Sequence, residues 1–167
     1  LAGCAQTRGL PASTAAAVAA GAEPVTESDE PEARKRARIR VELASGYFEQ
    51  GQTTVALDEI KLSLAADPTY AAAYTLRGLV YSRLNEIPLA EESFRRAQQL
   101  NPRDPDVLHH YGLCACQQGR YAQAIDLFQQ AMASPVYGGQ AKTLMAMGVC
   151  QVRAGQFAEA EGSLARA

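Results

Sequence analysis

The sequence predicts an all-α fold, an α-solenoid of about four helix-pair repeats behind a disordered N-terminal tether. The repeats are predicted by a residue pattern that returns at spacings of 34, 34 and 36 residues from residue 37 onward. Within this pattern small and large apolar residues recur together, as they do where the two helices of a repeat pack closely. The tether is predicted by residues 5–33, which contain no aromatic residue and no apolar periodicity.

Composition places the chain among globular proteins. Its 167 residues, 47% hydrophobic and 20% charged, are enough for one domain and too few for two large ones. The same composition excludes a collagenous or a wholly disordered chain. A net charge of −2 argues against a general nucleic-acid-binding protein, since such proteins carry an excess of Lys and Arg. No run of apolar residues approaches the length of a membrane span.

The first four residues, Leu1-Ala2-Gly3-Cys4, resemble the lipobox that ends the signal peptide of bacterial lipoproteins. The resemblance implies that residues 1–3 are a signal-peptide remnant and that Cys4 becomes the lipidated N-terminus. Ala5, rather than Asp, follows the cysteine, which in Gram-negative lipoproteins implies sorting to the outer membrane. The alternative is an unmodified cysteine in a flexible tail.

Residues 4–36 are predicted to form the lipidated cysteine and a flexible tether. Their Ala, Gly, Pro, Ser, Thr and Glu residues bury too little apolar surface to offset the entropy of ordering the chain. A short Ala-rich helix over Ser13–Ala20 is the alternative, although so short a helix is marginal in isolation. A basic run from Arg34 to Arg40 is assigned to a solvated helix face, with attraction to anionic lipid as the alternative.

The repeat units span residues 37–70, 71–104, 105–140 and 141–167. A small residue occupies the eighth position of each unit, an alanine the twentieth, and a large apolar residue the twenty-fourth. Gly or Asn, which tolerate the left-handed conformation, stands at the fifteenth position, where the first helix should end. In chain order these positions hold Ala44, Gly78, Gly112 and Gly148; Ala56, Ala90, Ala124 and Ala160; Ile60, Phe94, Phe128 and Leu164; and Gly51, Asn85, Gly119 and Gly155.

This pattern resembles the tetratricopeptide repeat, and the resemblance covers 131 of the 167 residues. It implies two antiparallel helices per unit, stacked into a superhelix because one unit cannot bury its own apolar face. Asp104 and Pro105 supply a helix N-cap followed by a proline in the first turn. The third unit has two extra residues, and the fourth stops within its second helix, so we expect the parent protein to continue beyond Ala167.

The first helices of such repeats line a concave surface. The residues at its usual positions are mostly apolar and uncharged, which predicts a groove for a peptide or protein segment with apolar side chains. Arg83 and Arg153 flank this groove, where they are placed to bind a carboxylate of the partner. The alternatives are that some of these side chains belong to the core or contact a second copy of the chain. The predicted groove residues are Val41, Ser45, Phe48, Thr75, Leu79, Ser82, Arg83, His109, Leu113, Met145 and Val149.

The repeats contain three cysteines, Cys114, Cys116 and Cys150. Cys114 and Cys150 occupy the same position in consecutive units, so they should point the same way and not face each other. Cys116 lies two residues on, about 200° around a helix, and leans toward the other flank. Helix geometry therefore favours a Cys116–Cys150 disulfide, which would persist in an oxidising compartment such as the periplasm. The alternative is three reduced cysteines.

No residue pattern in the sequence predicts catalysis, a metal site or a cofactor. His109 and His110 are adjacent, whereas a helical metal site uses histidines four residues apart. Cys114 and Cys116 lie too far around one helix to bind the same ion. Residues 138–143 lack the Gly-Lys pair and the spacing of a phosphate-binding loop. We therefore expect a protein that is not an enzyme.

Several segments carry a narrower resemblance: Glu42-Leu43-Ala44-Ser45-Gly46-Tyr47, Arg77-Gly78-Leu79-Val80-Tyr81, Tyr111-Gly112, Cys116-Gln117, Pro135-x-Tyr137 and Gly148-x-Cys150. With the lipobox and the tether, they resemble the type IV pilus biogenesis and stability lipoproteins, the pilotins of the pilus secretin. The resemblance implies a disulfide between Cys116 and Cys150, the pair that helix geometry also favours.

The same resemblance implies a lipid-anchored protein on the periplasmic face of the outer membrane of a Gram-negative bacterium. The lipoprotein sorting machinery would deliver it there through acylated Cys4. Its groove would bind secretin subunits and promote their outer-membrane targeting and multimerisation, which pilus assembly and twitching motility need. The first two units, with Phe48, Thr75, Leu79 and Arg83, are the expected contact. The alternatives are a general cell-envelope adaptor that scaffolds cell-wall enzymes or outer-membrane assembly factors, and a self-associating scaffold.

Overall fold

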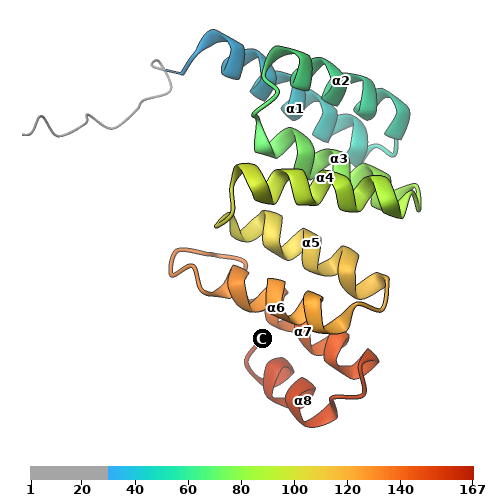
Figure 1. The fold of residues 1–167 in the computed structure, drawn as a ribbon, viewed down its shortest axis with the longest axis vertical. Coiled ribbons are helices and arrows are strands. Elements are labelled where there is room, and N and C mark those ends of the chain that lie inside the picture. The colour runs from blue at the N-terminus through green and yellow to red at the C-terminus, as the bar shows by residue number, and fades with distance from the viewer. Residues whose placement is uncertain (1–29) are drawn as a thin grey trace, which may run out of the picture.

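The computed structural model describes residues 30–167, and this part of the chain contains eight α-helices and no strand (Figure 1). The fold is therefore all-α, as the sequence predicts. The lipobox-like motif, Cys4 and most of the predicted tether lie in residues 1–29, outside the described residues. The helices are α1 (Glu32–Glu49), α2 (Thr53–Ala66), α3 (Ala71–Arg83), α4 (Ile87–Leu100), α5 (Pro105–Gln117), α6 (Tyr121–Met132), α7 (Gln140–Arg153) and α8 (Phe157–Ala165).

Consecutive helices pack as pairs, α1 with α2, α3 with α4, α5 with α6, and α7 with α8. The pairs follow one another along the long axis of the molecule, from α1 and α2 at one end to α7 and α8 at the other (Figure 1). The first helix of each pair also contacts the first helix of the next pair, whereas the second helices of the four described pairs do not contact each other. The first helices therefore line the inner, concave side of a superhelix, and the second helices form its outer side.

Close packing within each pair depends on the recurring small and large residues. The Gly78 backbone lies against the Phe94 ring, and a Cβ atom at Gly78 would be 2.7 Å from Phe94 Cε1. Gly112 and Phe128 repeat this arrangement at the same distance. Both phenylalanines are fully buried, so each ring fills the space that the missing side chain leaves between two helices.

Left-handed residues end the first helix of every pair. Asn85 has a φ of 59°, and Gly51, Gly119 and Gly155 have φ values of 77°, 75° and 77°. Between units, Asp104 caps α5, because its side chain accepts hydrogen bonds from the backbone N–H groups of Asp106 and Val107. These turn and cap residues are the ones that the sequence predicts.

The first helix begins at Glu32, ahead of the boundary at residue 37 that the repeat spacing predicts. Arg34, in its first turn, forms an ion pair with Asp67 and donates a hydrogen bond to Thr69 Oγ1 at 3.1 Å. These contacts with the loop after α2 hold the added turn, which explains why the helix extends into the segment predicted as tether. None of the helices within residues 30–167 is both long and apolar enough to cross a bilayer.

Candidate functional site

A groove of about 550 Å³ lies between α5 and α7, on the concave side of the superhelix. Its apolar surface comes mainly from Leu113 on α5 and from Met145, Ala146 and Val149 on α7. Met145 and Val149 are 58% and 45% exposed, and their spacing of four residues places them on one face of α7. The groove residues, as we use the term below, are His109, Leu113, Cys116, Gln117, Ala141, Lys142, Met145, Ala146, Val149 and Arg153.

The groove residues include two cations and no carboxylate. Lys142, in the first turn of α7, forms an ion pair with Asp106, at 3.3 Å between Nζ and Oδ1. Arg153, in the last turn of α7, has no hydrogen-bond or ion-pair partner among residues 30–167. One end of the groove therefore presents a cation that is partly neutralised, and the other end presents one that is not.

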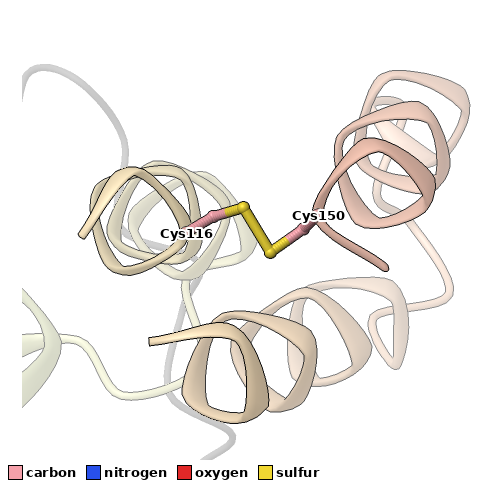
Figure 2. The surroundings of a disulfide bond; sticks show 2 residues. All are labelled: Cys116 and Cys150. Carbon is pink, nitrogen blue, oxygen red and sulfur yellow. A yellow bond between two sulfur atoms is a disulfide. The ribbon is translucent and has the colours of Figure 1, made fainter. Parts of the chain in front are cut away.

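A disulfide joins the two helices that form the groove walls. It links Cys116 on α5 to Cys150 on α7, whose Cα atoms are 5.9 Å apart, and Figure 2 shows the bridge spanning the space between the helices. This is the pair that helix geometry favours. Cys114, at the position of Cys150 one unit earlier, is a buried free thiol, and burial raises its pKa. Because Cys116 also lines the groove, the bridge helps to fix the spacing of its walls.

Three buried polar side chains form a hydrogen-bonded row beneath the groove. Thr143 Oγ1 lies 2.8 Å from His109 Nδ1 and 3.0 Å from the Tyr137 hydroxyl. Burial, together with the charges of His110 and Lys142, lowers the pKa of His109 to about 4. His109 is therefore uncharged at neutral pH and adds no charge to the groove.

Arg83, the other predicted carboxylate-binding residue, is engaged within the protein. Its guanidinium carbon lies 3.7 Å from the centroid of the Phe48 ring, and its Nη1 donates a hydrogen bond to the Phe48 carbonyl at 2.7 Å. Thr75 and Ser82, on the same helix, donate to the carbonyls of residues 71 and 78. In the second unit these predicted binding groups thus serve the protein's own structure.

Four of the eleven predicted groove residues come together in the groove: His109, Leu113, Met145 and Val149. Three of the others, Val41, Phe48 and Leu79, pack against a hydrophobic cluster of the first two units. The remaining four, Ser45, Thr75, Ser82 and Arg83, do not line the groove either.

The sequence did not predict Gln117, Ala141, Lys142 and Ala146 as groove residues, because the prediction covered only the usual concave-surface positions of each unit. The helical periodicity of α7 could have identified Lys142 and Ala146, since residues 142, 145, 146, 149 and 153 lie on one face.

The basic run on α1 is largely paired with carboxylates. Arg38 forms ion pairs with Glu30 and Glu42, and Arg40 forms one with Glu59 at 2.8 Å. These pairs reduce the positive charge that this face of α1 presents to anionic lipid.

Two sequence models of the tetratricopeptide repeat match the chain. One covers residues 41–105, and the other covers residues 104–167. Both walls of the groove lie within the second of these matches.

Several known proteins are similar to the chain. It is 30% identical over 114 residues to an uncharacterized protein of Haemophilus influenzae, a match that covers 68% of this chain and 64% of that protein. It is 26% identical over 121 residues to type IV pilus assembly protein PilF of Pseudomonas aeruginosa, covering 72% of this chain and 48% of PilF. The crystal structure of PilW, a widely conserved type IV pilus biogenesis factor, superimposes with a TM-score of 0.76 at 30% identity, covering 78% of this chain and 60% of PilW. The chain thus spans about half the length of PilF and less than two thirds of the other two.

Proposed function

Tetratricopeptide repeats build this chain from residue 41 to residue 167, and on that premise we propose that it is an outer-membrane lipoprotein that binds subunits of the type IV pilus secretin. Binding would promote the targeting of these subunits to the outer membrane and their multimerisation there. Pilus assembly and twitching motility would depend on both steps. The similarity to PilF and PilW supports a role in pilus biogenesis.

The observation that carries the proposal is the groove between α5 and α7. Its exposed apolar side chains, Met145 and Val149, lie together in one concave site. Apolar surface gathered in this way is typical of a site that another protein segment covers. An apolar side chain that a partner inserts would be removed from water together with Met145 and Val149. This burial would stabilise the complex by about 25 cal/mol for each Å² of apolar surface buried.

The membrane part of the proposal rests on the motif Leu1-Ala2-Gly3-Cys4. Acylation of Cys4 and the lipoprotein sorting machinery would bring the repeats to the periplasmic face of the outer membrane. A groove held at that face would collect secretin subunits at the membrane into which they insert. This role needs binding and positioning only, so we propose no catalytic step and no cofactor.

The test is an immunoblot for heat-resistant secretin multimers in outer-membrane fractions of a deletion strain. We expect the multimers to be lost in the deletion strain and restored by the wild-type protein. Met145→Asp places a charge in the groove, so it should not restore them. An unchanged multimer in the deletion strain would contradict the proposal and favour a general envelope adaptor.

The matched control is Leu62→Asp. Leu62 is 48% exposed on α2 and is not a groove residue. The variant therefore replaces an apolar side chain by Asp, as Met145→Asp does, at a site of comparable exposure outside the groove. We expect it to restore the multimers. Circular dichroism of both purified variants would establish that each one folds, and failure of both variants to restore would remove the groove from the proposal.

A further inference from the structure

We propose that the groove selects a segment in which a carboxylate and an apolar side chain lie two to four residues apart, with the carboxylate bound by Arg153 and the apolar side chain by Met145 and Val149. This inference rests on the proposed function, because it names the chemistry of the segment that the groove binds. Two observations support it. Arg83 and Arg153 stand at equivalent positions in different surroundings, and Arg153 is spaced regularly from the exposed apolar residues Met145 and Val149.

Arg83 and Arg153 occupy the same position in the second and fourth units, but only Arg83 has a partner among the described residues. Arg83 stacks on Phe48, which stands at the preceding position one unit earlier. The residue at the place of Phe48 in the third unit is Cys116, whose sulfur is bonded to Cys150. Arg153 therefore meets no aromatic ring there, and its guanidinium keeps its hydrogen-bond donors for a ligand.

The apolar part of the site lies on the same face of α7 as Arg153. Residues 145, 149 and 153 follow at intervals of four, so they span about 12 Å along the helix at 1.5 Å per residue. An extended peptide covers that length with about four residues, and it covers the shorter step from Val149 to Arg153 with about two. The carboxylate should thus lie about two to four residues from the apolar side chain of the partner.

The charge of the groove favours an acidic segment over a neutral or basic one. No Asp or Glu belongs to the groove residues, although the chain as a whole carries a net charge of −2. Lys142 already faces Asp106, so Arg153 is the cation that determines the position of an incoming carboxylate. Its guanidinium can hold a carboxylate with two parallel hydrogen bonds, which a single ammonium group does not offer.

The position of Val149 keeps part of its surface exposed in other units as well, although Val149 itself is more exposed. Leu79 and Leu113 stand at the same position in the second and third units, where a further unit follows. Both pack against a hydrophobic cluster with one part of the side chain, and the rest of each side chain stays exposed although a further unit follows. Val149 thus belongs to the surface that a bound segment meets.

The test uses the purified full chain and an array of 12-residue peptides of Gly, Ser and Thr. Each peptide carries one leucine and one glutamate two to four residues apart, and a matched set carries glutamine in place of the glutamate. Fluorescence anisotropy then gives the Kd of the strongest pair. We expect the glutamate peptide to bind about five- to tenfold more tightly at low ionic strength, and the preference to shrink as salt is added. Equal binding of the two peptides, or no binding of any peptide, would overturn the proposal.

Variants assign the preference to one side chain. Arg153→Gln should abolish the glutamate preference. Arg83→Gln, the same change at the same position of another unit, should keep the preference. Met145→Ser should weaken the binding of both peptides by the same factor, because it reduces only the apolar contact. A preference that survives in Arg153→Gln would overturn the assignment.

The peptide experiment and the multimer immunoblot separate the two proposals. A glutamate preference together with unchanged multimers in the deletion strain would contradict the secretin role and leave the chemistry of the groove standing. Loss of multimers in the deletion strain together with equal binding of the two peptides would support the secretin role and contradict the proposed carboxylate preference of the groove.

Discussion

The guanidinium of Arg83 covers the ring of Phe48 at 3.7 Å and donates a hydrogen bond to the Phe48 carbonyl at 2.7 Å. The two residues come from the ends of α3 and α1, so one side chain joins consecutive units in two ways. The acceptor is one of the last carbonyls of α1, and it also accepts a hydrogen bond from the Gly51 N–H at 3.0 Å. Arg83 therefore adds a second hydrogen bond at the end of α1, donated from the second unit.

We expect Arg83→Met to destabilise the protein by about 1 kcal/mol, because it removes a cation–π contact and a hydrogen bond while keeping most of the side-chain length. Urea unfolding followed by circular dichroism would measure the change. Arg153→Met is the matched control, since Arg153 has no partner among the described residues and its loss should leave the free energy of unfolding nearly unchanged. Equal effects of the two substitutions would contradict this assignment.

The contact between Gly78 and Phe94 predicts a strong effect from a single methyl group. A Cβ atom at Gly78 would lie 2.7 Å from the ring of Phe94, which is fully buried. Gly78→Ala should therefore cost about 1–3 kcal/mol of stability through overpacking. Gly46→Ala is the control, because no atom lies within 4 Å of its Cβ position and α1 should gain about 0.5–1 kcal/mol from the better helix former. Thermal unfolding of both variants would check the opposite signs, and a stabilised Gly78→Ala would contradict the packing argument.

The fold of the repeats can be predicted from the sequence because each packing contact joins positions at a fixed spacing within one unit. Gly78 and Phe94 are 16 residues apart, and Gly112 and Phe128 are separated by the same number. Local turn chemistry agrees with this spacing, since the left-handed Asn85 stands where glycine stands in the other units. Repetition and turn chemistry thus indicate the same helix pairs independently.

The candidate site is less predictable because its chemistry depends on contacts between units. Arg83 and Arg153 occupy the same position of their units, so the repeat pattern predicts the same role for both. The residue one unit earlier makes the difference, because Phe48 binds Arg83 whereas Cys116 offers Arg153 no aromatic ring. Tyr137 lies in the third unit's longer loop, which has no counterpart in the other units, so repeat alignment cannot place its hydroxyl beside Thr143. The groove between α5 and α7 likewise results from a packing of two units that no single unit encodes.

The disulfide between Cys116 and Cys150 should contribute substantially to stability. It closes a loop with a sequence separation of 34 residues, which by chain entropy alone corresponds to about 3–4 kcal/mol. The double substitution Cys116→Ala with Cys150→Ala should lower the urea midpoint accordingly, and a reductant should lower that of the wild type toward the same value. Cys114→Ala keeps the bridge, so it should respond to the reductant as the wild type does. A wild-type midpoint that a reductant leaves unchanged would contradict the prediction.

The buried His109 should make the protein less stable in mild acid. Its pKa is lowered from 6.5 to about 4, so as the pH falls below 6.5 the unfolded chain takes up a proton that the folded protein does not. The contribution of the uncharged His109 to the free energy of unfolding is therefore fully present above pH 6.5, and it is lost as the pH falls toward 4. Between pH 7 and 5 the loss should be about 1 kcal/mol, below the full value for this shift because the ring borders the groove, where water screens part of the charge. Neighbouring His110 has a lowered pKa and acts in the same direction, whereas Asp67 loses its ion pair only in stronger acid.

His109→Gln isolates this contribution, because glutamine does not titrate and can still bond to the Thr143 hydroxyl. Urea unfolding of the wild type and the variant at pH 7 and pH 5 gives the measurement as a difference of differences, from which the other titrating groups cancel. We expect the wild type to lose more stability than the variant over this range. An equal acid loss in the two proteins would mean that the His109 ring accepts its proton in the folded state as readily as in water, and that the polar row beneath the groove is not sealed from solvent.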